Sequence, residues 1–307
     1  MMAGLSVPLA IAALVACAAD GEPSATGQPR VVATTTQVGS AAREVGGDAI
    51  DLTVLLAPGV EAHDFALTPE QGAALEGADI ILVSGAGLED WLADTIAAVD
   101  AEDRVRDISE GIALRSPDAI GEDGEAAGAV DPHYWLSGPN AVHMVSNVRD
   151  ALAAADPGGS EGYDDRAADL VGRLESADTE VRALIDDVPV EDRGIVTDHD
   201  ALGYFIDEYG LRFVGSVFPS LDVSAAPSAQ DIEELVALIA AEGVKAIFTE
   251  SSVDPRLAEA IAAETDARLV DEPLYTDSLG PPGSGADTLD GMLLHDARVI
   301  RDGLLGD

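Results

Sequence analysis

Cysteine and aromatic residues are scarce in this chain. Among 307 residues there is one cysteine, Cys17, and aromatic residues amount to 4%. A lone cysteine excludes an intramolecular disulfide. Hydrophobic residues still make up 47% of the chain, so we expect a sizeable core built mainly from Ala, Val, Leu and Ile. The length suits one large or two medium-sized domains.

Basic residues are also few. The chain carries 16 basic and 58 acidic residues, a formal net charge of -42, and Lys245 is its only lysine. Nucleic acids and anionic lipid headgroups require basic patches, so the protein surface is expected to repel both. The acidic residues are spread along the whole chain, which indicates a solvated surface suited to high salt, where self-repulsion is screened. Diffuse carboxylates of this kind do not make a specific metal site.

The apolar run at residues 5–17 is too short to cross a bilayer as a helix. It ends in Leu14-Val15-Ala16-Cys17, which resembles the processing site of bacterial lipoproteins, where the cysteine becomes lipidated. We therefore expect a lipoprotein signal peptide at 1–17, lipidation at Cys17 and a flexible tether at 18–29, which is rich in Ala, Gly, Pro and Ser. No basic residue precedes the apolar run, and the alternative is an apolar N-terminal helix with a chance cysteine.

Residues 30–158 alternate between strand and helix patterns. β-Branched or continuous apolar runs predict strands at 30–36, 50–56, 78–84 and 105–108. Helices are predicted at 38–45, 88–98 and 139–154, and another begins at Pro69 behind Thr68 as its N-cap. This alternation predicts an α/β lobe with a mainly parallel sheet flanked by helices. Residues 116–130, mostly Gly, Asp, Glu and Ala, are expected to form a mobile loop.

A long helical pattern separates this lobe from the second half. Apolar residues step by three and four from Ala167 to Leu184, and a helix over 161–187 would extend roughly 40 Å. We expect a rigid connecting helix at 159–188, between a lobe at 30–158 and a second α/β lobe at 189–307. A helix contained within one domain is the alternative.

The second half repeats the pattern. Strands are predicted at 194–197, 211–217, 246–249 and 268–270, and helices at 201–209, 228–241, 254–264 and 287–305. Residues 272–285 are expected to form a loop that contains Tyr275-Thr276-Asp277-Ser278.

The five histidines fall into two contexts. His143 and His295 lie within helical patterns beside apolar positions, and we expect them to be structural or solvent-facing. His63, His133 and His199 lie in predicted loops, two of them soon after strands, and open α/β sheets bind ligands outside the carboxyl ends of their strands. These three imidazoles could converge on one metal ion, such as Zn²⁺, which favours nitrogen donors with a carboxylate.

Acidic residues accompany these histidines. Asp277 would complete a shell of four protein ligands. Acids within two residues of a ligating histidine often orient its ring; here they are Asp64, Asp131, Asp198 and Asp200. With 58 acidic residues in the chain, many such neighbours are coincidental. For any one histidine alone, the alternative is a ring that packs at a loop edge and hydrogen-bonds locally.

Several short segments follow one another in a characteristic order between Arg30 and Leu305. They are 32–35, Pro58-Gly59, His63-Asp64-Phe65, Thr68-Pro69, 87–92, 131–136, Tyr163 with Leu174, 198–205, 227–229, 248–252 and 274–279. In this order, behind a lipoprotein processing site, they resemble the solute-binding lipoproteins of zinc and manganese ABC importers. The resemblance implies two α/β lobes joined by one long rigid helix in a C-clamp, with the metal in the cleft between the lobes.

The same resemblance assigns the site residues. His63 and His133 would be the metal ligands from the first lobe, and His199 and Asp277 those from the second. Glu250, with Asp198, would lie behind the ligands without binding the metal. A histidine rather than a glutamate at the third ligand position favours Zn²⁺ over Mn²⁺. Many zinc members carry a histidine-rich loop before the second ligand; the loop here holds acids and no histidine, which weakens that preference.

The function implied is capture of Zn²⁺, or alternatively Mn²⁺, and its delivery to an ABC permease with its ATPase subunit. The protein would be an extracytoplasmic monomer, anchored to the outer face of the cytoplasmic membrane through lipid on Cys17. It would not be an enzyme, because four protein ligands leave no position for a reactive water. The alternatives are a metallohydrolase that uses the same histidines and a surface adhesin-type lipoprotein. Neither a His-Glu-x-x-His helix nor a nucleophile elbow favours the hydrolase.

Overall fold

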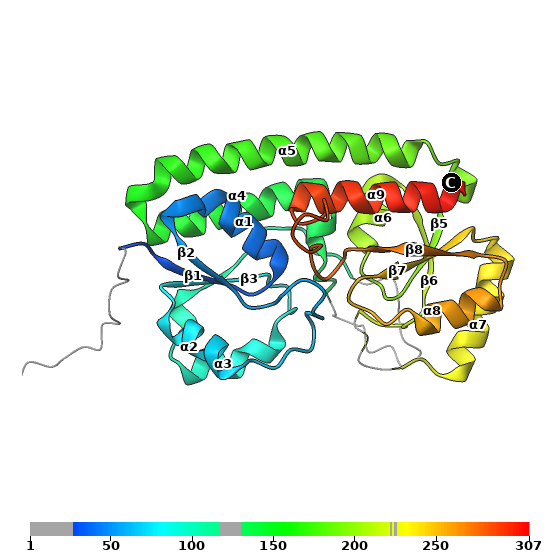
Figure 1. The fold of residues 1–307 in the computed structure, drawn as a ribbon, viewed down its shortest axis with the longest axis horizontal. Coiled ribbons are helices and arrows are strands. Elements are labelled where there is room, and N and C mark those ends of the chain that lie inside the picture. Colours follow the sequence, from blue (N-terminus) through cyan, green and yellow to red (C-terminus); the bar gives the residue numbers. More distant parts are fainter. Residues whose placement is uncertain (1–26, 117–129, 222, 224–225, 307) are drawn as a thin grey trace, which may run out of the picture.

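The computed structural model describes residues 27–116, 130–221, 223 and 226–306. The predicted signal peptide at 1–17 with Cys17, most of the predicted tether at 18–29 and nearly all of the predicted loop at 116–130 lie outside the described residues. Two α/β lobes lie side by side beneath one long helix (Figure 1). The predicted fold class is confirmed. Within the described residues, no helix combines the length and the apolar character needed to span a membrane.

Four parallel strands form the sheet of the first lobe, in the order β2-β1-β3-β4. The central β1 is buried over Val31, Val32 and Ala33, as expected for a strand covered on both faces. The strands are β1 Arg30–Ala33, β2 Asp51–Val54, β3 Ile80–Val83 and β4 Val105–Asp107. The helices are α1 Thr36–Gly46, α2 Pro69–Gly77, α3 Ala93–Ala98 and α4 Gly138–Ala155. α1 and α4 cover the face towards the long helix, and α2 and α3 cover the other (Figure 1).

The second lobe repeats this topology, with four parallel strands in the order β6-β5-β7-β8. The strands are β5 Gly194–Thr197, β6 Arg212–Ser216, β7 Ala246–Glu250 and β8 Arg268–Leu274. The helices are α6 Gly203–Tyr209, α7 Ala229–Glu242, α8 Arg256–Ala263 and α9 Leu289–Leu305. Because each sheet is parallel, all its strands end at the same edge, where loops that bind ligands collect.

Short 3₁₀ turns connect several of these elements. They are η1 Gly47–Ala49, η2 Asp90–Leu92, η3 Glu102–Arg104, η4 Tyr134–Leu136, η5 Pro157–Gly159 and η6 Val190–Asp192. The predicted start of α2 is correct in detail. Thr68 caps the helix, Pro69 opens it, and Thr68 and Gln71 form a reciprocal capping box.

The long helix α5, Ser160–Asp186, extends over both lobes (Figure 1). It packs against α4 of the first lobe and α9 of the second. Its buried face consists of Tyr163, Ala167, Leu170, Leu174, Ala177, Val181 and Ile185. Most of these side chains belong to one hydrophobic cluster with residues of both lobes, so the lobes share a core under α5. The helix lies within the predicted segment 159–188, while the division into domains at 30–158 and 189–307 stays a prediction.

The predicted end of the last strand is wrong. β8 does not stop at Val270 but continues through Pro273 to Leu274. β8 lies at the edge of its sheet, where the N–H that proline lacks has no ladder hydrogen bond to make. The residues predicted to begin a loop at 272 therefore extend the strand to within three residues of Asp277.

The helix predicted at 88–98 also begins later than expected, with η2 at Asp90 and α3 at Ala93. Glu89 has the non-helical dihedrals φ -102° and ψ 43°. Its buried carboxylate accepts hydrogen bonds from the N–H groups of Ser84 and Gly85, at 2.6 and 3.0 Å. These bonds bring Glu89 back to the end of β3 and delay the helix.

Two positions on opposite faces of α5 test the shared core. Leu174 is fully buried, whereas Gly172 is exposed, with no atom within 4 Å of an added Cβ. We expect Leu174→Ala to lower the free energy of unfolding by about 2–5 kcal/mol through lost packing. Gly172→Ala should raise it by about 0.5–1 kcal/mol, because alanine is the better helix former. Urea denaturation of metal-free protein measures both; destabilisation by both substitutions would contradict this assignment of the helix faces.

Candidate metal centre

The four residues predicted as metal ligands meet at the carboxyl edges of the two sheets. His63 lies in the loop after β2, and His133 follows β4 and directly precedes η4. His199 follows β5, and Asp277 follows β8. One donor atom from each of these side chains lies within 4.8 Å of all the others. Each lobe therefore contributes two residues to one cluster, which we call the His₃Asp cluster.

The donor atoms of the His₃Asp cluster are spaced like the corners of a coordination shell. His133 Nε2 lies 3.1 Å from His63 Nε2 and 3.1 Å from Asp277 Oδ1. Asp277 Oδ2 lies 3.5 Å from His199 Nε2, and Asp277 Oδ1 lies 4.0 Å from His63 Nε2. A tetrahedral ion with bonds of about 2.1 Å places its donors roughly 3.4 Å apart. The observed spacings fit one such cation.

A buried acid orients the ring of His133. Oδ1 of the fully buried Asp131 lies 2.8 Å from His133 Nδ1 and accepts from the His133 backbone N–H at 2.9 Å. Arg115 Nη1 donates to the other oxygen of Asp131 at 3.2 Å. With Nδ1 donating to Asp131, the lone pair of Nε2 faces the cluster. The spacing in the sequence predicts Asp131, but nothing local predicts Arg115.

Glu250 lies behind His199, but only its contact with the backbone is a hydrogen bond, because His199 Nδ1 has no well-aligned partner. Its Oε2 lies 3.0 Å from His199 Nδ1, and its Oε1 accepts from the His199 backbone N–H at 3.0 Å. Asp198 lies one step further from the cluster, since its Oδ2 accepts from the Glu250 backbone N–H at 2.8 Å. Burial and the charge of Glu250 raise the pKa of Asp198 to about 7. Both acids thus lie behind a ligand candidate.

His63 is the least buried member of the cluster. Its side chain is 14% exposed, against 0% for His133 and His199 and 2% for Asp277. The backbone N–H groups of His63 and Asp64 each donate to the carboxylate of Glu61 at 2.8 Å. His63 therefore lies where solvent reaches the cluster, on a loop that Glu61 holds in place.

Sequence reasoning misses Glu61. It precedes His63 by two residues, as Asp131 precedes His133, and this repeated spacing is the signal that could have revealed it. Asp64, expected from its position to orient a histidine ring, is instead exposed.

The segment that carries Asp277 is held by the first lobe. The carbonyl of Thr276 accepts from Trp135 Nε1 at 2.9 Å and from Gln37 Nε2 at 3.0 Å. Two further hydrogen bonds cross between the lobes at 2.8 Å, Leu279 N–H to Thr36 Oγ1 and Gly59 N–H to Ser278 Oγ. Within the second lobe, the Tyr275 N–H donates to Asp296 at 2.9 Å and the Thr276 hydroxyl donates to Glu250, so contacts with both lobes position Asp277.

The electrostatics of the cluster favour protonated imidazoles when no metal is bound. Burial opposes the charged form of His133, but Asp131 and Asp277 outweigh it and raise the pKa of His133 to about 9. Burial is likewise outweighed at His199, where the charges of Glu250 and Asp277 raise the pKa well above its ordinary value. Burial would raise the pKa of Asp277, but the contacts with His199 and His133 hold it well below its usual range.

Two donors of the cluster have close neighbours without well-aligned hydrogen bonds. His199 Nε2 and Asp277 Oδ1 are both buried and unsatisfied in this sense. A buried polar group without a partner costs about 1–3 kcal/mol, and a bound cation would remove that cost. Three imidazole nitrogens with one carboxylate suit Zn²⁺ and neighbouring transition metals.

The other two histidines lie outside the cluster, as their helical contexts predict. His143 is exposed on α4. His295, on α9, donates from Nε2 to the carbonyl of Pro273 at 3.0 Å. Either residue can therefore serve as a reference for the ligand candidates.

Comparison with known proteins decides which family this fold and cluster represent. A family model described as zinc-uptake complex component A, periplasmic, matches residues 31–303. The chain belongs to this family. The resemblance seen in the sequence is thus confirmed. The zinc-uptake component family consists of transport components, so the prediction that the chain is not an enzyme is confirmed as well.

Relatives of the chain align with it over nearly its whole length. The manganese-binding lipoprotein MntA of Bacillus subtilis is 29% identical over 97% of each chain. The iron-binding protein YfeA of Yersinia pestis is 29% identical, over 90% of this chain and 88% of its own. The structure of the periplasmic zinc-binding protein TroA from Treponema pallidum matches with a TM-score of 0.83 and 28% identity, covering 91% of this chain and 99% of its own. Relatives of similar identity are therefore named for three different metals.

Asp131→Asn tests whether the buried acid prepares His133 for a metal. The amide keeps the shape of the side chain but removes its charge, so we expect Zn²⁺ affinity to fall about 10–100-fold with all four ligand candidates intact. Asp64→Asn removes the same charge from an exposed site next to His63 and should leave the affinity unchanged. Titration against a competing chelator measures both; equal losses would mean that only the overall charge matters.

Proposed function

We propose that this protein is the extracytoplasmic solute-binding component of a metal ABC importer, which captures a transition-metal cation between its lobes and delivers it to a membrane permease. The observation that carries the proposal is the His₃Asp cluster. Four donor atoms, two from each lobe, lie within 4.8 Å of one another. Family membership and relatives named for manganese, zinc and iron support the same function.

The proposed ligands are His63, His133, His199 and Asp277, which together fill a four-coordinate shell. Such a shell binds a cation as cargo and leaves no position for a reactive water. We favour Zn²⁺ as the cargo because three of the four donors are imidazole nitrogens, and we keep Mn²⁺ as the alternative. Glu250 and Asp131 would hold two of the rings in the orientation that binding requires.

The unequal burial of the ligands suits reversible capture. Because His63 is the only one of the four with a side chain more than 2% exposed, the cation would arrive and leave past His63. The other three ligands would already be in place before the cation arrives. Release to the permease would then require movement of the loop after β2 rather than separation of the shared core.

The remaining parts of the proposal concern partners and location. The permease and its ATPase subunit would be the protein partners, with the solute-binding protein a monomer. Lipidation of Cys17 would anchor the protein to the outer face of the cytoplasmic membrane, through a tether at 18–29. The relative MntA is itself named a lipoprotein. Membrane fractionation of a Cys17→Ser variant tests the anchor.

A single histidine substitution tests the cluster and the transport function together. His133→Ala removes a fully buried donor, and we expect Zn²⁺ affinity to fall by more than the roughly 100-fold at the upper end for residues that only orient ligands. His143→Ala, on the exposed face of α4, is the matched control and should bind like the unaltered protein.

The same pair of variants can be compared in cells that lack the native protein, by following uptake of radioactive zinc and manganese. Uptake should be restored by His143→Ala but not by His133→Ala. Equal metal affinity of the two variants would contradict the assignment of the His₃Asp cluster as the binding site. If His133→Ala lost metal affinity as expected but still restored metal uptake, the proposed role in an importer would be contradicted instead.

The pH dependence of binding follows from the raised histidine pKa values. Metal must displace protons from His133, whose pKa is about 9, and from His199, whose pKa is also raised. Asp277 has a lowered pKa and is already ionised. We therefore expect apparent affinity to rise with pH throughout the range in which His133 is protonated in the free protein, and the His133 contribution to this rise to end as its pKa near 9 is passed. Calorimetry in buffers of different ionisation enthalpy should record net proton release over this range.

The stability of the metal-free protein should change in the opposite direction. A raised histidine pKa stabilises the fold below the unfolded value of about 6.5, and this contribution is lost as the pH rises through about 9. The Tm of metal-free protein should fall across that window, while the rise in Tm on adding Zn²⁺ grows. A Zn²⁺-induced shift that is independent of pH would count against imidazole ligands.

A further inference from the structure

A cavity separate from the His₃Asp cluster lies where α1 and β2 of the first lobe meet the segment before α9. Its volume is about 550 Å³, within the range of small-molecule sites. Apolar side chains from both lobes line much of it, namely Val54, Leu56, Pro58, Leu279 and Pro282. The hydrogen bond from Leu279 N–H to Thr36 Oγ1 joins its two walls at 2.8 Å.

Arg43 lines this cavity from α1, where it is exposed and lies close enough to Glu44 for its charge to act on that carboxylate. All 16 basic residues lie in the described part of the chain, and there only Arg43 has a side chain that makes neither a hydrogen bond nor an ion pair. In a protein with a net charge of -42, carboxylates that could pair with an arginine are abundant. A guanidinium left unpaired at the mouth of a cavity is therefore available to an anion from outside.

Ser40 precedes Arg43 by one helical turn, so both side chains lie on the same face of α1. Ser40 also lines the cavity, is only 2% exposed, and its hydroxyl makes no hydrogen bond. The hydroxyl oxygen itself is not fully buried, so it is open to the cavity, where an acceptor on a ligand would take its hydrogen bond. Arg43 and Ser40 thus offer two donors on one wall, opposite apolar side chains of the second lobe.

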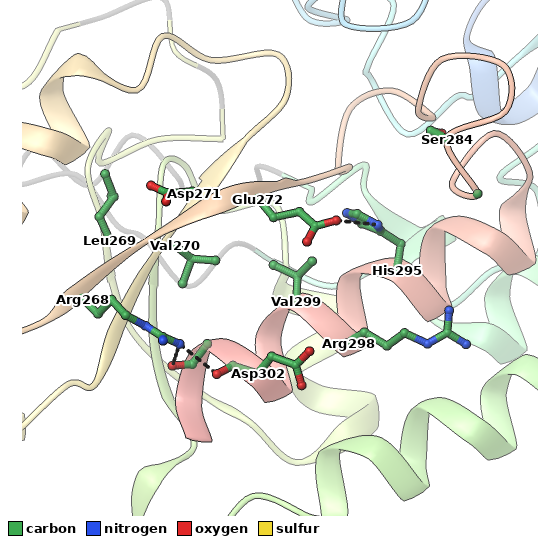
Figure 2. A pocket seen from close by; sticks show the side chains of 12 residues that line it. Arg268, Leu269, Val270, Asp271, Glu272, Ser284, His295, Arg298, Val299 and Asp302 are labelled. Atoms are coloured by element: carbon green, nitrogen blue, oxygen red, sulfur yellow. Dashed lines mark hydrogen bonds and ion pairs between the residues drawn. The ribbon is translucent and has the colours of Figure 1, made fainter. Parts of the chain in front are cut away.

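A second cavity of about 550 Å³, between β8 and α9, is different because its basic side chains are already paired. Arg268 donates to the carbonyls of Asp302 and Gly303, each at 2.8 Å (Figure 2). Arg298 donates to Glu180 at 2.7 Å. Cavity volume alone therefore does not distinguish the two; the unpaired donors on α1 do.

Acidic residues at the rim limit the charge of a ligand. Glu44 and Asp287 both line the cavity. Glu44 is paired with Arg173, whereas Asp287 accepts from the Gly283 N–H at 2.9 Å, and the backbone N–H groups there hold its pKa below the usual range. A ligand with one negative charge would reach Arg43 without a second charge near Asp287.

We propose that this cavity is a binding site for a small organic monocarboxylate with an apolar body. The carboxylate accepts from the guanidinium of Arg43 and the hydroxyl of Ser40. The body packs between Leu56 of the first lobe and Leu279 of the second. The site goes beyond metal capture and uses none of the proposed metal ligands.

Three eight-carbon probes test the charge and shape of this site on the metal-free full chain. Octanoate should bind saturably, with a Kd on the order of 1 mM for a ligand of this size. Octanamide lacks the charge and suberate carries a second carboxylate, so each should bind at least about tenfold more weakly. Methyl NMR should place the octanoate shifts on Val54, Leu56 and Leu279, which distinguishes this cavity from binding at the protonated histidines.

Two substitutions and a control locate the carboxylate. Arg43→Gln should weaken octanoate binding about tenfold, and Ser40→Ala by a smaller factor. Arg256→Gln removes the same charge from α8, where the side chain is 83% exposed, and should change nothing. Urea denaturation establishes that each variant folds. Unchanged octanoate affinity in Arg43→Gln, equal binding of the three probes, or methyl shifts confined to other residues would overturn the proposal.

Discussion

The contact between a buried carboxylate and the far nitrogen of an imidazole is the interaction on which the candidate centre depends. Asp131 and Glu250 each do two things at once, because each approaches a ring Nδ1 and accepts the backbone N–H of the same histidine. One acid thereby fixes both the main chain and the ring of His133 or His199. Turning either ring away gives up its contact with the acid, so part of the conformational cost of assembling a coordination shell is met during folding. The same acids determine how strongly protons compete for the site.

The fourth corner of the shell depends on contacts between the lobes. Asp277 follows an edge strand, which by itself is a poorly constrained position. It is held in part because the carbonyl of its neighbour Thr276 accepts from Trp135 and Gln37 of the first lobe. The continuous apolar cluster beneath α5 keeps the lobes at the separation that these hydrogen bonds require. Core packing and ligand geometry are therefore coupled, although none of the four ligand candidates belongs to the apolar cluster.

Local patterns predict a large part of this molecule. Capping residues and apolar periodicity locate most helices, and the end of β5 and the three loop histidines point to the carboxyl edges of the sheets. The predictions that fail concern residues whose conformation depends on partners distant in the sequence. Pro273 suggests a loop until β8 is known to be an edge strand, and Glu89 looks helical until its hydrogen bonds to Ser84 and Gly85 are seen. The role of Arg115 cannot be predicted from the sequence for the same reason, since its hydrogen bond to Asp131 forms only in the folded chain.

The partial exposure of His63 has a consequence for rates rather than equilibria. Because the other three donors are buried, a cation bound at the proposed centre would meet His63 first and leave past it last. In that proposal, a change that loosens the loop between β2 and α2 would speed the departure of the cation. The Glu61 carboxylate accepts hydrogen bonds from the N–H groups of His63 and Asp64. It would therefore slow the loop movement that releases the cation. In the proposed centre, how long the cargo stays bound would depend on this loop, while the buried acids behind the rings would prepare the ligands that hold it.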